Sequence, residues 1–275
     1  MKGMLFGGCS FTWGQGLYFY SDLTNLPYNT QNYGFDYKTI NESMLRYKNA
    51  VRFPRLVAQH FDTFEVVRDD IGKLYGNGGS EDETFAYFDY LFNVERKFKY
   101  CDFDYIVIQL SNLWRNNFVF ELNGIEYQTK IMDLYLYDHI EKEIILTNEL
   151  NEYCKINNFT FDDLKSELLK QQFKRLKEKV IFYQKRGIKI KIVSWLSDMI
   201  NLILSDPLLN DTHVPIIYDN LTFNGIQDLM DYDKNFEIEY NLKHNKNILC
   251  EDKHPSLNCH KVIAHSIIEN IKRDK

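Results

Sequence analysis

A serine and a histidine with the chemistry of a nucleophile and a base lie near opposite ends of the sequence. Ser10 follows the apolar segment 4–6 and the glycine pair Gly7-Gly8. A serine on a sharp turn after a strand needs neighbours that tolerate unusual backbone dihedrals and close approach. Such a turn exposes the hydroxyl and directs backbone N–H groups toward an incoming carbonyl oxygen. The same residues also fit a tight turn in which Ser10 caps the next helix, so the segment predicts either a nucleophile or a helix cap.

His254 is the candidate base, because a serine hydroxyl becomes a good nucleophile only when a base removes its proton. Asp252 lies two residues earlier, and in an extended segment the two side chains project to the same side. The carboxylate could then orient the imidazole and stabilise its charged form. Pro255 disfavours helical dihedrals at His254, which favours an extended loop. A surface turn with both side chains solvated is the alternative.

The segments that would position these residues alternate between strand-like and helical patterns of apolar residues. Short apolar segments typical of strands occur at 4–6, 64–67, 105–110 and 188–195, and helical patterns occur at 44–61, 81–92, 161–186 and 258–271. This alternation predicts βαβ units. We therefore expect one α/β domain over 1–275, with a doubly wound (flavodoxin-like), mostly parallel sheet flanked by helices and with insertions at 116–160 and 199–249.

Local signals place several helix ends. Ser80 and Glu83 have the spacing of a capping box, which predicts a helix start at 81. Pro54 marks a start or a kink within 44–61. Gly187 is placed to end the long helix in a left-handed turn.

Ligands of open α/β sheets bind outside the carboxyl ends of the strands. Ser10, the Gly78-Gly79-Ser80 stretch and the Ser111-Asn112 pair each follow a predicted strand, and the polar stretch 251–255 precedes the terminal helix. The sheet is therefore expected to bring all four to one edge.

Two further side chains lie beside these positions. Arg115 follows the third strand and could bind an anionic group of a substrate or form a surface ion pair. Cys9 is expected to point into the sheet as a small buried residue and not to act as a thiol nucleophile.

Composition narrows the class of protein. The 275 residues include 33 Lys and Arg and 39 Asp and Glu, for a net charge of −6, so the chain lacks the basic field that nucleic-acid binding needs. The five cysteines are widely spaced without a C-x-x-C pair, which argues against a disulfide framework or a zinc site. No apolar segment is long enough for a signal peptide or a membrane span. We expect a cytoplasmic protein without nucleic-acid partners.

The set of motifs resembles the SGNH (GDSL-type) hydrolase family. Gly8-Cys9-Ser10-Phe11-Thr12 resembles its first block and Gly78-Gly79-Ser80-Glu81-Asp82 its second. Asp252-Lys253-His254-Pro255-Ser256, with His260 downstream, resembles its last block. The third block, Gly-x-Asn-Asp in the family, reads Gln109-Leu110-Ser111-Asn112 here. The carboxylate spacing also differs: Asp252 is two residues before His254, whereas Glu251 has the family's spacing of three and is a rival for the same role.

The resemblance implies a fold, a reaction and roles for particular residues. Ser10 would be the nucleophile, His254 the general base and Asp252 its orienting partner. The oxyanion hole would use the N–H groups of Ser10 and Gly78 together with Asn112 or Ser111. No cofactor or metal is implied. The expected activity is hydrolysis of small acyl esters, acetyl esters of carbohydrates among them, on a small-molecule or glycan substrate.

Two other functions fit the same sequence. A sugar hydroxyl in place of water would make the protein an O-acyltransferase acting on a surface glycan. The altered third block also fits a carbohydrate-binding module that keeps the fold without the chemistry.

Overall fold

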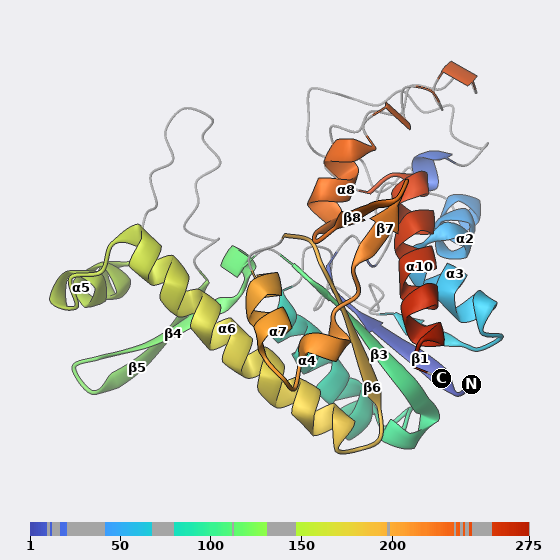
Figure 1. Cartoon of the computed structure of the whole chain (residues 1–275). Helices are drawn as coiled ribbons and strands as arrows, with labels where there is room; N and C mark the ends of the chain where they lie inside the picture. Colours follow the sequence, from blue (N-terminus) through green and yellow to red (C-terminus); the bar gives the residue numbers. More distant parts are fainter. Residues whose placement is uncertain are drawn as a thin grey trace.

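A central sheet of four parallel strands organises the protein (Figure 1). The computed structural model describes residues 1–9, 12, 17–20, 42–67, 80–111, 113–130, 147–196, 199–233, 235–236, 239, 242–243 and 255–274. The strands β1 (Gly3–Gly7), β2 (Glu65–Val67), β3 (Phe103–Leu110) and β6 (Lys189–Ser194) lie in the order β2-β1-β3-β6, and each neighbouring pair is parallel. The predicted α/β class with a mainly parallel sheet is confirmed.

Successive side chains of these buried strands point to opposite faces of the sheet and form a hydrophobic core on each face. Met4, Phe6 and Val107 face the helices α3 (Phe53–His60) and α10 (Leu257–Lys272). Leu5, Ile106 and Ile108 face α4 (Glu81–Asp89) and α6 (Phe161–Gln184). Because successive strand residues point to opposite faces, apolar residues at nearly every position fit a sheet covered by helices on both sides.

The helix ends follow the local signals. The segment 44–61 forms α2 (Glu42–Val51) and α3, and Pro54 lies in the first turn of α3. Ser80 caps α4 in a complete capping box with Glu83. After α4 the chain continues as a π-helix, η3 (Tyr90–Glu95), and beyond α6 Gly187 has a left-handed φ of 78°.

A satellite core forms beside α6 within the segment 116–160. It contains the hairpin of β4 (Asn117–Leu122) and β5 (Ile125–Lys130), together with α5 (Asn148–Ile156). The two residues between the strands, Asn123 and Gly124, have φ values of 54° and 76°. Asn-Gly is the preferred pair for a two-residue hairpin turn with positive φ at both positions. The Asn123-Gly124 pair is therefore a sequence signal for this hairpin.

The segment 199–249 contributes small elements beyond β6. These are α7 (Ile200–Ser205), η8 (Asn210–Thr212), the hairpin of β7 (Ile216–Tyr218) and β8 (Leu221–Phe223), and α8 (Ile226–Tyr232). Three short 3-10 helices complete the described elements: η1 (Leu17–Tyr20), η4 (Tyr100–Asp102) and η5 (Leu113–Arg115). That 116–160 and 199–249 are insertions in one domain stays a prediction.

Both ends of the described chain lie at the amino edge of the sheet (Figure 1). Lys2 donates its backbone N–H to Asp104, 2.8 Å away. The buried Lys191 pairs with Asp274 at 2.9 Å, and Tyr105 donates to the same carboxylate. Burial, together with this carboxylate, raises the pKa of the Tyr105 phenol. These contacts leave the opposite, carboxyl edge to the predicted site.

No helix in the described part of the chain is both long and apolar enough to cross a membrane. No disulfide bond joins the described cysteines, which are Cys9, Cys101, Cys154 and Cys259.

Candidate functional site

The turn after β1 is fixed to the end of β3 by one buried carboxamide. The Oε1 atom of Gln109 accepts hydrogen bonds from the backbone N–H of Cys9 at 3.0 Å and from the Thr12 hydroxyl at 3.3 Å. The Cys9 thiol also donates to this atom, and Cys9 is buried as expected. The backbone that leads into Ser10 is therefore held against the neighbouring strand.

Gly8 is required by this close approach. A Cβ atom at Gly8 would lie 2.7 Å from Oε1 of Gln109 and would also collide with the Thr12 hydroxyl oxygen. Only a residue without a side chain lets the turn approach the carboxamide so closely.

The start of α4 meets the end of β3 through a buried acid. Ser80 accepts a hydrogen bond from the Glu83 N–H, which closes the cap. The next side chain, Glu81, turns inward and accepts the backbone N–H of Ser111 at 2.6 Å and its hydroxyl at 3.4 Å. Burial raises the pKa of the Glu81 carboxyl, although the hydrogen bonds to it act in the opposite direction.

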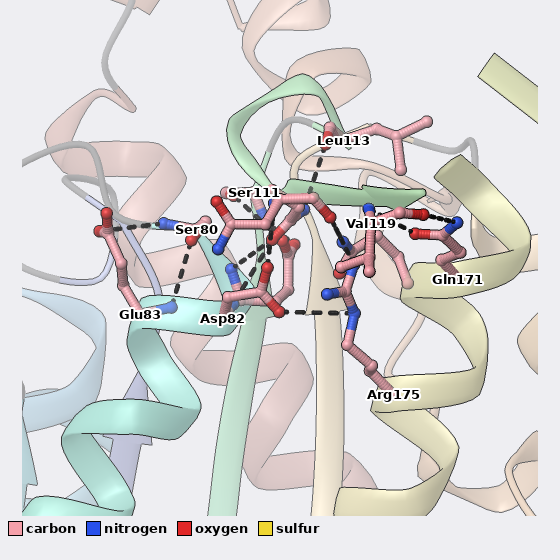
Figure 2. Close-up of polar contacts among 12 residues, drawn as sticks. Ser80, Asp82, Glu83, Ser111, Leu113, Val119, Gln171 and Arg175 are labelled. Atoms are coloured by element: carbon pink, nitrogen blue, oxygen red, sulfur yellow. Dashed lines mark hydrogen bonds and ion pairs between the residues drawn. The ribbon is translucent and has the colours of Figure 1, made fainter. Parts of the chain in front are cut away.

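A second set of contacts extends this junction to α6 (Figure 2). The Asn116 side chain accepts the backbone N–H of Glu81 at 3.0 Å. Asp82 accepts the N–H of Asn117 and lies 3.6 Å from the Arg175 guanidinium, which in turn donates to the Asn117 carbonyl. The segment that follows β3 is thus bound on both sides, by the start of α4 and by α6.

A stacked cation lies at the same edge, between β3 and β6. The Arg115 guanidinium lies 5.1 Å from the ring centroid of Trp195. The backbone N–H of Trp195 donates to the Leu110 carbonyl at 2.9 Å, so the two residues extend from neighbouring strand ends. Arg115 therefore lies where an α/β sheet binds its ligands.

The predicted site residues divide between described and undescribed positions. Ser10, Gly78, Asn112, Glu251, Asp252 and His254 lie outside the described residues. Ser111 and Arg115 are described, both at the carboxyl edge. Both hydrogen-bond donors of Ser111 are directed at Glu81, so in this structure they are engaged within the protein.

Residues that lie seven and ten positions after Ser10 pack with a residue three positions after His254. Leu17 and Tyr20, which follow Ser10, form one buried cluster with Leu257, which follows His254. The imidazole Nδ1 of His260 on α10 accepts the backbone N–H of Phe53, and the two rings stack. His260 is therefore a structural histidine of the helix.

Gln109 and Glu81 are site residues for which sequence reasoning assigned no role. Gln109 is a polar residue near the end of an otherwise apolar strand, and that position was a usable signal. Glu81 follows a cap residue, where an acid is ordinary, so nothing local marked it as buried. Within the described ranges, no group of three His, Cys, Asp or Glu side chains could hold a metal ion.

No family model, curated protein or solved structure matches this chain.

A Glu81→Gln variant is expected to remove a pH dependence of stability. The pKa of Glu81 is raised on folding. The contribution of this carboxyl to the free energy of unfolding is therefore complete below the unfolded-state pKa of about 4.5 and is lost as pH rises through the folded-state pKa. Glutamine keeps an acceptor for Ser111 but does not titrate. As pH rises above 4.5, the free energy of unfolding of the variant should therefore increase relative to that of the wild type, by at most about 1.4 kcal/mol per pH unit.

Denaturant unfolding of both proteins across a pH series measures this difference. Glu178→Gln, the same substitution on the exposed side of α6, is the matched control. A pH-independent difference for Glu81→Gln would contradict the prediction.

Proposed function

We propose that this protein is a serine esterase of the SGNH type that hydrolyses small acyl esters, with acetyl esters of carbohydrates as the expected substrates. Ser10 is the nucleophile, His254 the general base and Asp252 the carboxylate that orients it. The proposal combines the motif resemblance with the geometry of the carboxyl edge. It requires no cofactor in any step.

The observation that carries the proposal is the packing of Leu17 and Tyr20 against Leu257. Leu17 and Tyr20 lie seven and ten positions after Ser10, and Leu257 lies three positions after His254. Their contact supports the view that the two segments approach one another at the carboxyl edge. The anchoring of Cys9 on Gln109, 3.0 Å away at the end of β3, supports the same location for the nucleophile.

The proposed reaction has two steps. His254 accepts the proton of Ser10 as its oxygen attacks the ester carbonyl, and the tetrahedral oxyanion receives hydrogen bonds from Ser10 N–H, Gly78 N–H and Asn112. His254 then gives the proton to the departing alcohol, which leaves an acyl-enzyme. In the second step His254 deprotonates water, whose attack releases the acid and restores Ser10.

Asn112 is the better candidate for the third oxyanion donor. The alternative, Ser111, has both of its donors directed at the Glu81 carboxyl, at 2.6 and 3.4 Å. A donor engaged in this way would have to leave a buried carboxyl before serving an oxyanion, and that exposes an unsatisfied buried group.

The test is covalent labelling with a fluorophosphonate. We expect the wild type to be labelled at Ser10, and we expect Ser10→Ala to remain unlabelled and to lose hydrolysis of p-nitrophenyl acetate. Ser205→Ala, an exposed serine on α7, is the control and should label like the wild type. A folded wild type that neither labels nor hydrolyses any ester in a panel of acetylated sugars would refute the proposal. Acetyl transfer to sugar without release of acetate would favour the O-acyltransferase alternative.

A further inference from the structure

The Arg115 guanidinium lies over the Trp195 ring, and one of its nitrogens has no hydrogen-bond acceptor among the described residues. Its Nη1 atom is buried without a hydrogen-bond partner, and no acid in the described chain pairs with it. The guanidinium carbon lies 5.1 Å from the Trp195 ring centroid, a cation–π distance, and Arg115 as a whole is half-buried. A buried N–H without an acceptor is costly, so a bound group that reached this nitrogen and supplied an acceptor would be stabilising.

Two acids described at the carboxyl edge are already engaged elsewhere. Asp82 accepts from Asn117 and pairs with Arg175. Glu81 is occupied by Ser111. Arg175 in this region thus has its carboxylate, whereas no acid in the described part of the chain pairs with Arg115.

Trp195 is held in place as a rigid support for this cation. Its indole N–H donates to Gln227 Oε1 at 3.0 Å, and its carbonyl accepts the backbone N–H of Gln227 at 3.0 Å. A Cβ atom at Gly225 would lie 2.7 Å from the same carbonyl, so α8 begins in tight contact with the Trp195 backbone. The indole, held at both its N–H and its backbone carbonyl, is a fixed surface beside the guanidinium, and a preorganised site loses less entropy when a ligand binds.

We propose that Arg115 and Trp195 form a binding subsite for an anionic group, a carboxylate or a phosphate, on the substrate. This inference rests on the proposed esterase function and narrows its substrate to acyl esters of acidic molecules. The planar edge of arginine forms two parallel hydrogen bonds with either oxyanion. The protein carries a net charge of −6, so recognition of an anion must come from this local pairing and not from the overall field.

The binding test uses inorganic phosphate and succinate as probes, with tryptophan emission as the readout. A bound anion changes the surroundings of the Trp195 ring, so emission should change in the wild type and the change should be lost in Trp195→Phe. Arg115→Ala should weaken binding about tenfold or more, since a hydrogen bond to a charged group is worth at least that factor. Arg115→Lys keeps the charge but lacks the planar edge, so its affinity for the probes should lie between those of Arg115→Ala and the wild type.

Arg186→Ala is the matched control for this test. Arg186 also stacks, 3.4 Å from the Phe182 ring centroid, at the far end of α6, and its loss should leave the probe affinities unchanged. Binding of phosphate alone or of succinate alone would support the subsite and identify the anion. Equal affinities in Arg115→Ala and the wild type, or no binding of either probe to the wild type, would overturn it.

A kinetic test separates this inference from the esterase proposal. For an acetyl ester that carries a carboxylate or a phosphate, kcat/KM of Arg115→Ala should fall about tenfold or more. For a neutral acetyl ester it should stay unchanged. Equal losses on both esters would overturn the subsite while leaving the esterase intact. If no ester is hydrolysed, the esterase proposal fails, and the anion titration still decides the binding site.

Discussion

Replacing His254 with alanine is expected to lower kcat for acetyl-ester hydrolysis by about 10⁴-fold or more. Without the imidazole, no group removes the proton of Ser10, and the alcohol leaves without a proton donor. Steady-state kinetics together with a thermal unfolding profile measures the effect, since the variant should stay folded.

His265→Ala is the control for this substitution, because His265 is exposed on α10 and lies away from the carboxyl edge. His260 is unsuitable, since its buried ring supports Phe53 and its loss would destabilise the fold. Asp252→Asn should also cost several orders of magnitude, and Glu251→Gln should cost little. The reverse pattern would assign the orienting role to Glu251. Full activity in His254→Ala would eliminate the proposed base.

The second large effect is expected from Gly8→Ala. Its Cβ would be 2.7 Å from the Gln109 carboxamide oxygen, so the turn or the buried carboxamide must shift. Overpacking of this kind costs about 1–3 kcal/mol in the free energy of unfolding. Because the same turn leads directly into Ser10, fluorophosphonate labelling should slow in parallel.

Cys9→Ala provides the matched comparison at the next position. It removes a buried thiol but adds no atom near Gln109, so it should cost less stability and should retain labelling of Ser10. Denaturant unfolding and labelling rates of the two variants are measured together. A Gly8→Ala protein as stable and as reactive as Cys9→Ala would show that the close approach at this turn has no consequence.

The secondary structure that positions the site was predictable because its signals are local. The apolar segments of β1 and β3, the Ser80 capping box and Gly187 each act within a few residues of the chain. The predicted strands and the predicted helical segments are therefore confirmed, and most of their ends agree within one or two residues. The Asn123-Gly124 hairpin carried an equally local signal that the sequence analysis did not use.

The polar contacts of the site could not be predicted because they join distant parts of the chain. Gln109 meets Cys9 across 100 sequence positions, and Glu81 meets Ser111 across 30. In the sequence, Gln109 is a single polar residue in an apolar strand, and Glu81 is an ordinary acid at the start of a helix. Only the parallel pairing of β1 with β3 brings such residues to one edge. The roles of Ser10, Asp252 and His254 stay predictions from the motifs.

The place of β1 in the sheet has a consequence for how the protein is made. β1 lies between β2 and β3, so a nascent chain has its first strand ready long before residues 103–110 leave the ribosome. Until then one side of a very apolar strand has no partner and can pair with another chain. Long-range pairing of this kind slows folding. Pairing of β1 on both sides must therefore wait until β3 has been synthesised.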